Sequence, residues 1–180
     1  MSTGSRPSPP ISATDAQLIE AAYRAHHESV RAFARRLVGE PQAAEDLLQE
    51  TFVALPRALG RADAQATTVG LLLGICANHA RHHVRAAARR RAATTRLGQE
   101  PPASSRGPES AAERTQLRAS LLRALDQLSI DHRIVIVLCD VEERTAGEVA
   151  TVLQIPEATV RTRLFHARKR LRSAFEGEAP

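Results

Sequence analysis

The C-terminal part of the chain carries a dense set of cations: Arg161, Arg163, Arg168, Lys169, Arg170 and Arg172. A guanidinium group stays charged, and its planar donors match phosphate oxygens and the edge of a guanine base. Such a set can bind a polyanion, but it supplies no nucleophile and no general base. These residues therefore predict recognition of nucleic acid rather than catalysis.

The stretch from Thr145 to Arg172 predicts two helices joined by a tight turn. Thr145 is a suitable N-cap and Glu148 completes a capping box, while Ile155-Pro156 interrupts the first helix. The turn places Gln154 where glycine often supplies a positive φ. Each helix has one apolar stripe, formed by Val149, Ala150, Val152 and Leu153, then by Val160, Leu164, Ala167 and Leu171. This layout is typical of a helix-turn-helix whose second helix enters a DNA major groove.

The composition favours helices and a polyanionic partner. The chain has four Phe, one Tyr and no Trp, and no segment alternates with the period of a strand, so we expect an all-α protein. Its formal net charge is +5, which favours binding to a polyanion. The polar, proline-rich N-terminus lacks a secretory core, and no run approaches the roughly 20 apolar residues needed to cross a bilayer. We therefore expect a cytoplasmic protein that does not insert into a membrane.

The two cysteines give no sign of a metal site or a cofactor. Cys76 and Cys139 lie in different predicted helices, and we interpret them as free thiols in a reducing compartment. Cys76, His79 and His83 could share one helical face, but the set is incomplete for structural zinc. A buried thiol beside two histidines is the favoured interpretation, and no metal or cofactor is expected.

Changes in composition divide the chain into two small helical domains. We predict a disordered tail over 1–14, a first domain over 15–92 and a second over 113–178. Residues 93–112 between them hold three prolines and two glycines and predict a flexible linker. Fully stretched, these 20 residues would span at most about 70 Å.

The expected helices follow from stop and start signals. In the first domain a helix over 15–38 ends at Gly39, with a possible break at His26-His27. The next begins at Pro41 and ends or kinks before Pro56. A loop over 60–68 leads to a third helix over 69–92. In the second domain, helices over 111–128 and 131–141 precede the helix-turn-helix.

Charges in the first domain are segregated. Glu45, Asp46 and Glu50 lie on the second helix, whereas Asn78 to Arg96 contains six Arg, three His and no acid. Like charges at this density repel along a helix, unless an anion neutralises them. Two basic helices on two tethered domains predict a two-point grip on nucleic acid, in which the first contact raises the effective concentration for the second.

Two segments resemble a known family. The string AEDLLQETF, Ala44 to Phe52, is similar to the signature of conserved region 2 of bacterial sigma-70 factors, and LLLGICANHARHHVR follows at a fitting distance. The segment from Leu125 to Arg172 resembles region 4. Having regions 2 and 4 with only a short linker between them resembles the extracytoplasmic-function (ECF) group. The resemblance covers about 150 residues, and the motifs occur together and in the family's order.

The resemblance implies partners and residue roles. Core RNA polymerase would be bound through the clamp helices of its largest subunit and through its flap region, and an anti-sigma factor is a candidate further partner. The implied clamp-binding residues are Asp46, Gln49, Glu50 and Phe52. The promoter −10 element would be recognised and melted by the loop over 60–68 and by Asn78, Arg81, His82, Arg85 and Arg89. The −35 element would be read by Thr159, Arg161, Thr162, Arg163, His166, Arg168 and Arg170.

Three positions depart from the family pattern. The family usually has an aromatic residue at the positions of Pro56 and Leu71, and its Leu-Pro before region 4 is Leu128-Ser129 here. Because unstacked bases prefer aromatic platforms, the first two departures bear on strand opening. They leave the polymerase-binding assignment untouched.

The sequence therefore predicts a non-catalytic sigma factor that directs RNA polymerase to specific promoters. One alternative is a stand-alone helix-turn-helix regulator, which would form a dimer on a palindromic site. A second is a sigma-like domain pair that titrates a regulator. The least specific alternative is an amphipathic helical pair with a solvated basic face and no nucleic-acid partner. No phosphate loop, paired carboxylates or nucleophile–base pair indicates an enzyme.

Overall fold

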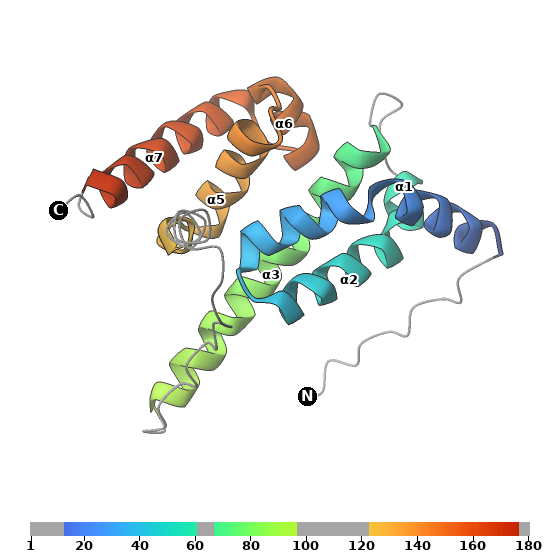
Figure 1. The fold of residues 1–180 in the computed structure, drawn as a ribbon, viewed down its shortest axis with the longest axis horizontal. Helices are drawn as coiled ribbons and strands as arrows, with labels where there is room; N and C mark the ends of the chain where they lie inside the picture. Colours follow the sequence, from blue (N-terminus) through green and yellow to red (C-terminus); the bar gives the residue numbers. More distant parts are fainter. Residues whose placement is uncertain (1–12, 61–66, 97–122, 177–180) are drawn as a thin grey trace, which may run out of the picture.

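The computed structural model describes residues 13–60, 67–96 and 123–176, and every regular element in these ranges is helical. Figure 1 shows two groups of helices lying side by side. The N-terminal unit contains α1 (Ala13–Val38), α2 (Pro41–Leu59) and α3 (Thr68–Arg96). The C-terminal unit, residues 123–176, contains α5 (Ile130–Ile136), the π-helical turn η1 (Val137–Val141), α6 (Ala146–Leu153) and α7 (Glu157–Glu176). The predicted all-α fold with two helical units is confirmed.

The N-terminal unit is a three-helix bundle with a continuous apolar centre. Each helix contributes side chains that are at most 1% exposed: Val30, Phe33, Leu37, Leu47, Leu48, Leu55, Leu72 and Leu73. Fully burying one such side chain contributes about 1.5–3 kcal/mol. Gly39 follows α1 with φ of +72°, as predicted for a glycine that ends a helix. The bundle thereby holds α2 and α3 rigidly against each other.

The helices of this unit differ from the prediction at three points. Helix α1 runs unbroken through His26-His27, where the His27 ring stacks on Tyr23 and its Nδ1 lies 3.0 Å from the Tyr23 carbonyl oxygen. Helix α2 continues past Pro56 to Leu59, because a proline in the last turns sacrifices only one backbone hydrogen bond. Helix α3 extends to Arg96 rather than Ala92, since no glycine or proline occurs between Ala92 and Gly98.

Some predicted segments lie outside the described residues. These are residues 1–12 of the tail, 61–66 of the loop, 97–112 of the linker and 111–122 of the helix expected over 111–128. Where these segments are described, residues 13 and 14 already belong to α1, and residues 68 and 93–96 belong to α3.

The C-terminal unit contains the predicted helix-turn-helix. Thr145 and Glu148 form the capping box, with the Thr145 amide donating to Glu148 Oε2 at 2.8 Å. Gln154 takes the left-handed conformation at φ of +53° that ends α6. Val149, Leu153, Val160 and Ala167 are buried between α6, α7 and the preceding helix. The helix predicted over 131–141 is regular only to Ile136, since its last turn widens into η1, where the Glu142 amide donates to the Val137 carbonyl at 3.0 Å.

The two thiols differ in their surroundings. Cys76 is fully buried, and burial raises its pKa to about 12 despite a hydrogen bond with Thr51 that acts in the opposite sense. Cys139 is half-buried, and its pKa is also raised, first by burial and then by the Asp140 carboxylate. Both thiols are free.

We expect only Cys139 to react with a thiol reagent such as Ellman's reagent in the folded protein at pH 8. The thiolate is the reactive species. The Cys76 thiol is buried away from the reagent and stays protonated at this pH. Spectrophotometric titration should give one reactive thiol, which Cys139→Ser removes, and two after denaturation. Rapid reaction of two thiols in the native chain would contradict the described core.

Candidate nucleic-acid interface

Helix α7 carries all seven residues predicted for the −35 element. Five are exposed along its surface: Arg161, Thr162, His166, Arg168 and Arg170. Thr159 and Arg163 are half-buried, and Arg163 faces Asp131 in the first turn of α5. The helix is held from beneath by Val160 and Ala167, which are fully buried. A rigid helix therefore presents a row of donors outward.

Acidic side chains hold three of these arginines in place. Arg161 Nε donates to Glu157 Oε1 at 3.0 Å, one turn earlier on α7. Arg168 makes a two-point contact with Asp140, at 3.0 Å from Nε and 2.6 Å from Nη2. Arg163 Nη1 lies 3.5 Å from Asp131 Oδ1. The pairs of Arg161 and Arg168 are exposed, and such pairs contribute only about 0–1 kcal/mol, so a phosphate can replace either carboxylate at little cost.

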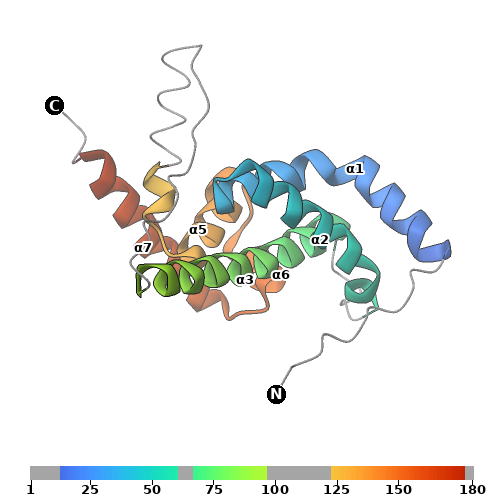
Figure 2. The same ribbon diagram turned by 90° about the horizontal axis from the view of Figure 1, so that it is seen from below.

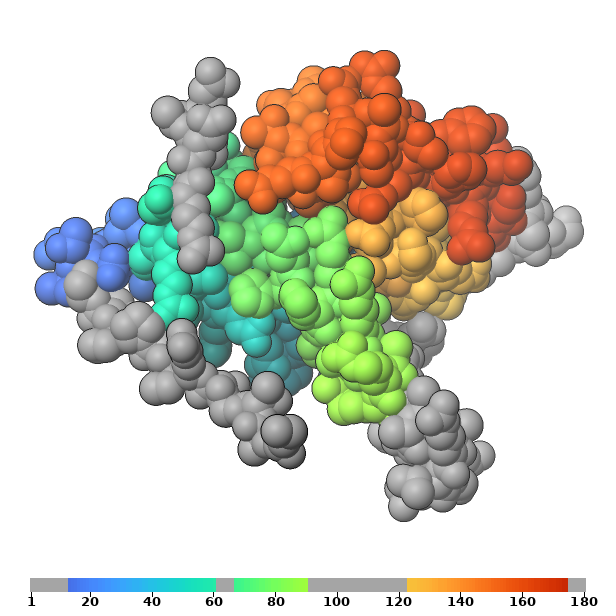
Figure 3. Space-filling view, turned by 180° about the vertical axis from the view of Figure 1, so that it is seen from behind, coloured from blue at the N-terminus to red at the C-terminus, as the bar shows by residue number. Residues whose placement is uncertain are grey.

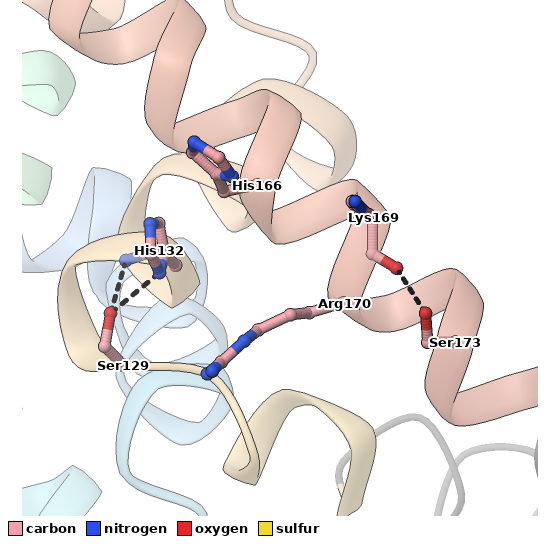
Figure 4. A pocket seen from close by; sticks show the side chains of 6 residues that line it. All are labelled: Ser129, His132, His166, Lys169, Arg170 and Ser173. Carbon is pink, nitrogen blue, oxygen red and sulfur yellow. Dashed lines mark hydrogen bonds between the residues drawn. The ribbon is translucent and has the colours of Figure 1, made fainter.

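A basic notch of about 430 Å³ opens between α5 and α7 and is lined by Ser129, His132, His166, Lys169, Arg170 and Ser173. Figure 4 shows the two imidazoles and the Arg170 guanidinium at this opening. The pKa of His132 is lowered by burial and then by the positive charges of His166 and Arg170. The lining contains cations and hydroxyls but no carboxylate, and this chemistry suits a phosphate group.

Three residues of the basic notch were missed as functional residues in the sequence: Ser129, His132 and Ser173. Ser129 replaces the family's proline, and its hydroxyl lies 2.9 Å from His132 Nδ1 and caps α5. The spacing of His166, Arg170 and Ser173 places them on one face of a helix, which was a usable signal. The sequence contains no such signal for His132, because its place in the notch depends on how α5 packs on α7.

The predicted −10 residues lie along α3. Asn78, His82, Arg85 and Arg89 are exposed. Arg81 differs, since only 13% of its side chain is exposed and its Nε donates to Asp131 Oδ1 at 2.8 Å. In this conformation the structure therefore turns Arg81 toward the C-terminal unit rather than toward solvent.

The predicted polymerase-binding helix has one acidic, exposed face. Asp46, Gln49 and Glu50 are exposed on α2, and Glu50 Oε2 lies 2.9 Å from His79 Nδ1. Phe52 does not belong to this face: it is 3% exposed and packs edge-on against Tyr23. Its burial agrees with the inner face that its helical spacing predicts, whereas its polymerase-binding role comes from the family resemblance and stays a prediction. Val53, at 57% exposed, lies beside Gln49 and Glu50 and was missed, although its helical spacing places it there.

The described residues provide no cluster for a metal ion. No group of three or more His, Cys, Asp or Glu residues converges within the described ranges. Cys76 is turned into the core next to Thr51, whereas His79 pairs with Glu50 on the surface. None of the helices in these ranges is long and apolar enough to span a membrane.

Comparisons with known proteins identify both units. The profile of sigma-70 region 2 matches residues 22–90, and that of sigma-70 region 4 matches residues 118–171. The RNA polymerase sigma-H factor of Pseudomonas aeruginosa is 31% identical over 149 residues, which cover 78% of this chain and 77% of that protein. The chain belongs to the sigma-70 family. The ECF sigma factor SigL of Mycobacterium tuberculosis is 30% identical and aligns over 91% of this chain and 92% of its own length, which supports the ECF group.

A solved structure shares the fold of this sigma factor. The sigma factor RpoE of Bartonella quintana, determined in complex with the anti-sigma factor NepR, has a TM-score of 0.68 and covers 91% of this chain and 99% of its own. At 21% identity this likeness concerns the fold alone. The N-terminal unit is thus region 2 and the C-terminal unit region 4. As a sigma factor, the protein directs RNA polymerase to specific promoters for initiation of transcription.

Proposed function

We propose that this sigma factor binds core RNA polymerase through the exposed face of α2 and contacts promoter DNA through α3 and α7. The observation that carries the proposal is the separation of charge. Asp46, Gln49 and Glu50 form an acidic face on α2, whereas α3 and α7 present exposed arginines and histidines. One surface is suited to a protein partner and two are suited to a polyanion.

Helix α7 is proposed to read the −35 element. Arg161, Thr162 and His166 are exposed on consecutive turns, which suits contact with base edges in a major groove. The basic notch would hold a backbone phosphate beside that groove. Phosphate contacts fix the register of a protein on DNA, while base contacts provide the sequence preference.

Helix α3 is proposed to contact the −10 element through Asn78, His82, Arg85 and Arg89. Exposed arginines and an amide can bind both the backbone and the bases of an opened strand. Pro56 and Leu71 supply no aromatic platform, so stacking at those two positions does not contribute to strand opening.

The remaining assignments follow from the family. The sigma factor would contribute no catalytic group, work in the cytoplasm and also contact the polymerase flap through region 4. RpoE, its structural relative, was crystallised in complex with an anti-sigma factor, and a protein of that class is the further partner that we propose here.

Run-off transcription with purified core polymerase on a library of genomic promoter fragments tests the proposal. We expect specific initiation from a subset of fragments that share −10 and −35 elements, whereas core enzyme alone gives none. Gel filtration of the chain should give the mass of a monomer. A dimer that binds a palindrome without polymerase, together with no specific run-off product, would instead support a stand-alone regulator.

A further inference from the structure

The basic notch is assembled by two helices of region 4. Ser129 and His132 come from the start of α5, whereas His166, Arg170 and Ser173 come from one face of α7. Figure 2 shows α5 and α7 packed side by side. Figure 3 shows their surfaces meeting at the end of the molecule opposite the start of α1. The notch is therefore a property of the folded unit, and neither helix carries it alone.

Two imidazoles lie next to each other at the opening of the notch. The ring centroids of His132 and His166 are 6.2 Å apart, and the rings are tilted by 53° to each other. The Arg170 guanidinium lies at the same opening (Figure 4), and Lys169 adds a further positive charge to the lining. A phosphate group accepts several short, charge-assisted hydrogen bonds from cations of this kind. The notch thus directs several donors toward a volume that suits one such group.

A hydrogen bond with Ser129 orients the His132 ring. His132 Nδ1 lies 2.9 Å from Ser129 Oγ. A protonated imidazole donates from both of its nitrogens, so charged His132 donates to Ser129 through Nδ1 and keeps its Nε2–H for an anion. The proline that the family usually has at this position carries no hydroxyl. The orientation of the His132 ring is therefore a feature of this chain rather than of the family pattern.

The surroundings of His132 oppose its positive charge. Its pKa is lowered by burial and then by three cationic side chains of α7, which are His166, Arg170 and Arg163. Asp131, beside it on α5, acts in the opposite sense, but that carboxylate is also engaged by Arg81 and Arg85 of α3. A bound oxyanion would favour the protonated ring, because an opposite charge within about 4–6 Å stabilises the charged form. Anion binding and proton uptake at His132 therefore favour each other.

We propose that the basic notch is a proton-linked phosphate site, in which His132 and His166 bind one phosphate group and His132 takes up a proton from solvent as that group binds. The promoter backbone supplies the phosphate, because His166 lies one turn after the exposed Thr162 on the helix proposed to read the −35 element. The inference rests on that proposed contact of α7 with DNA. Region 4 then holds the promoter more tightly as the pH falls from neutral, and the gain levels off once His132 is charged without DNA as well.

The pH dependence of promoter binding provides the first test. Holoenzyme affinity for a promoter selected by run-off transcription is measured at about pH 6 and about pH 8, where a phosphodiester keeps its charge. The gain on acidification should be about fivefold or more larger for the wild type than for His132→Gln, a usual size for coupled binding events. Glutamine retains a donor but cannot be protonated. His26→Gln, which removes a half-buried imidazole from α1, is the matched control and should behave as the wild type. Equal gains in all three chains would overturn the proposal.

A second pair of variants tests the orientation of the ring and leaves every charge in place. Ser129 has a φ of −60°, which proline adopts without strain, so Ser129→Pro removes the hydroxyl that holds His132. Ser129→Thr is the conservative variant, because threonine keeps both the hydroxyl and the N-cap. We expect Ser129→Pro to lose part of the gain on acidification and Ser129→Thr to keep it, with helicity unchanged by circular dichroism in both. A folded Ser129→Pro variant with the full gain would contradict the proposed geometry.

Sulfate binding to the full chain without polymerase separates failure of the site from failure of the proposed function. Sulfate has the shape of phosphate and a constant charge across this pH range. At an ionic strength held constant with chloride, sulfate should raise the midpoint at which the His132 ring titrates in NMR spectra, and His166→Gln should reduce that rise. An unmoved midpoint would overturn the site. A raised midpoint with equal promoter gains in the wild type and His132→Gln would overturn the promoter backbone as the source and support a free phosphate ester. A raised midpoint in a chain that gives no specific run-off product would overturn the proposed function alone.

Discussion

Replacing Glu50 with lysine is expected to weaken binding of the sigma factor to core RNA polymerase by about 30-fold or more. Glu50 is 57% exposed beside Asp46 and Gln49 on one face of α2. Removing one partner of an interfacial charge pair costs about 2–5 kcal/mol, and each 1.4 kcal/mol is about tenfold in affinity. The lysine also faces His79, the present partner of Glu50, so no compensating contact forms.

The control for this experiment is Glu20→Lys. Glu20 is 60% exposed on α1, where it pairs with Arg24, and its replacement makes the same change in net charge. Binding is measured with labelled core polymerase and, separately, with promoter DNA in the absence of polymerase. Only Glu50→Lys should lose polymerase affinity, and both variants should bind DNA alike. Equal loss of polymerase binding by both variants would show a general charge effect and no specific face on α2.

Much of the fold could be predicted because its signals are local. The capping box at Thr145 and the positive φ at Gln154 depend on neighbouring residues only, and both were read correctly. The helix end predicted at Pro56 was wrong because the free-energy cost of a proline depends on its position in a helix, and near the last turn that cost is small. The inward position of Phe52 follows from its helical spacing, whereas the polymerase-binding role comes only from the family signature that includes it.

The arrangement of the two units could not be predicted in the same way. Asp131 looks in the sequence like an ordinary acid in the first turn of a helix. Its neighbour Arg81 is 50 residues away, and nothing in either segment encodes the meeting. Gly74, where α3 packs closely against α6, is equally uninformative in the sequence, since a glycine inside a helix indicates close packing but does not show which helix packs against it. Pairings between separate helical units depend on shape over the whole interface, which no short motif carries.

The second large effect is expected on promoter selectivity. Replacing Arg161 with alanine should reduce discrimination between a promoter with an intact −35 element and one with that element scrambled by about fivefold or more. Arg161 is 72% exposed on the first turns of α7, and Glu157 one turn earlier orients its guanidinium. A bidentate contact between arginine and a base is worth about 1–3 kcal/mol of discrimination, and alanine leaves nothing in its place.

Arg172→Ala is the matched control for charge. Arg172 is exposed on the same helix three turns further on, where a helix entering a groove has passed the base edges and faces the backbone. Both variants remove one positive charge, and Arg172→Ala, which loses a backbone contact, should reduce the salt dependence of binding by about one unit of slope. Only Arg161→Ala should lower the ratio of affinities for the intact and scrambled elements, measured with polymerase holoenzyme on a promoter selected by run-off transcription. A selectivity ratio that is unchanged in both variants would mean that α7 contacts phosphates alone, and that the −35 sequence is read elsewhere on region 4.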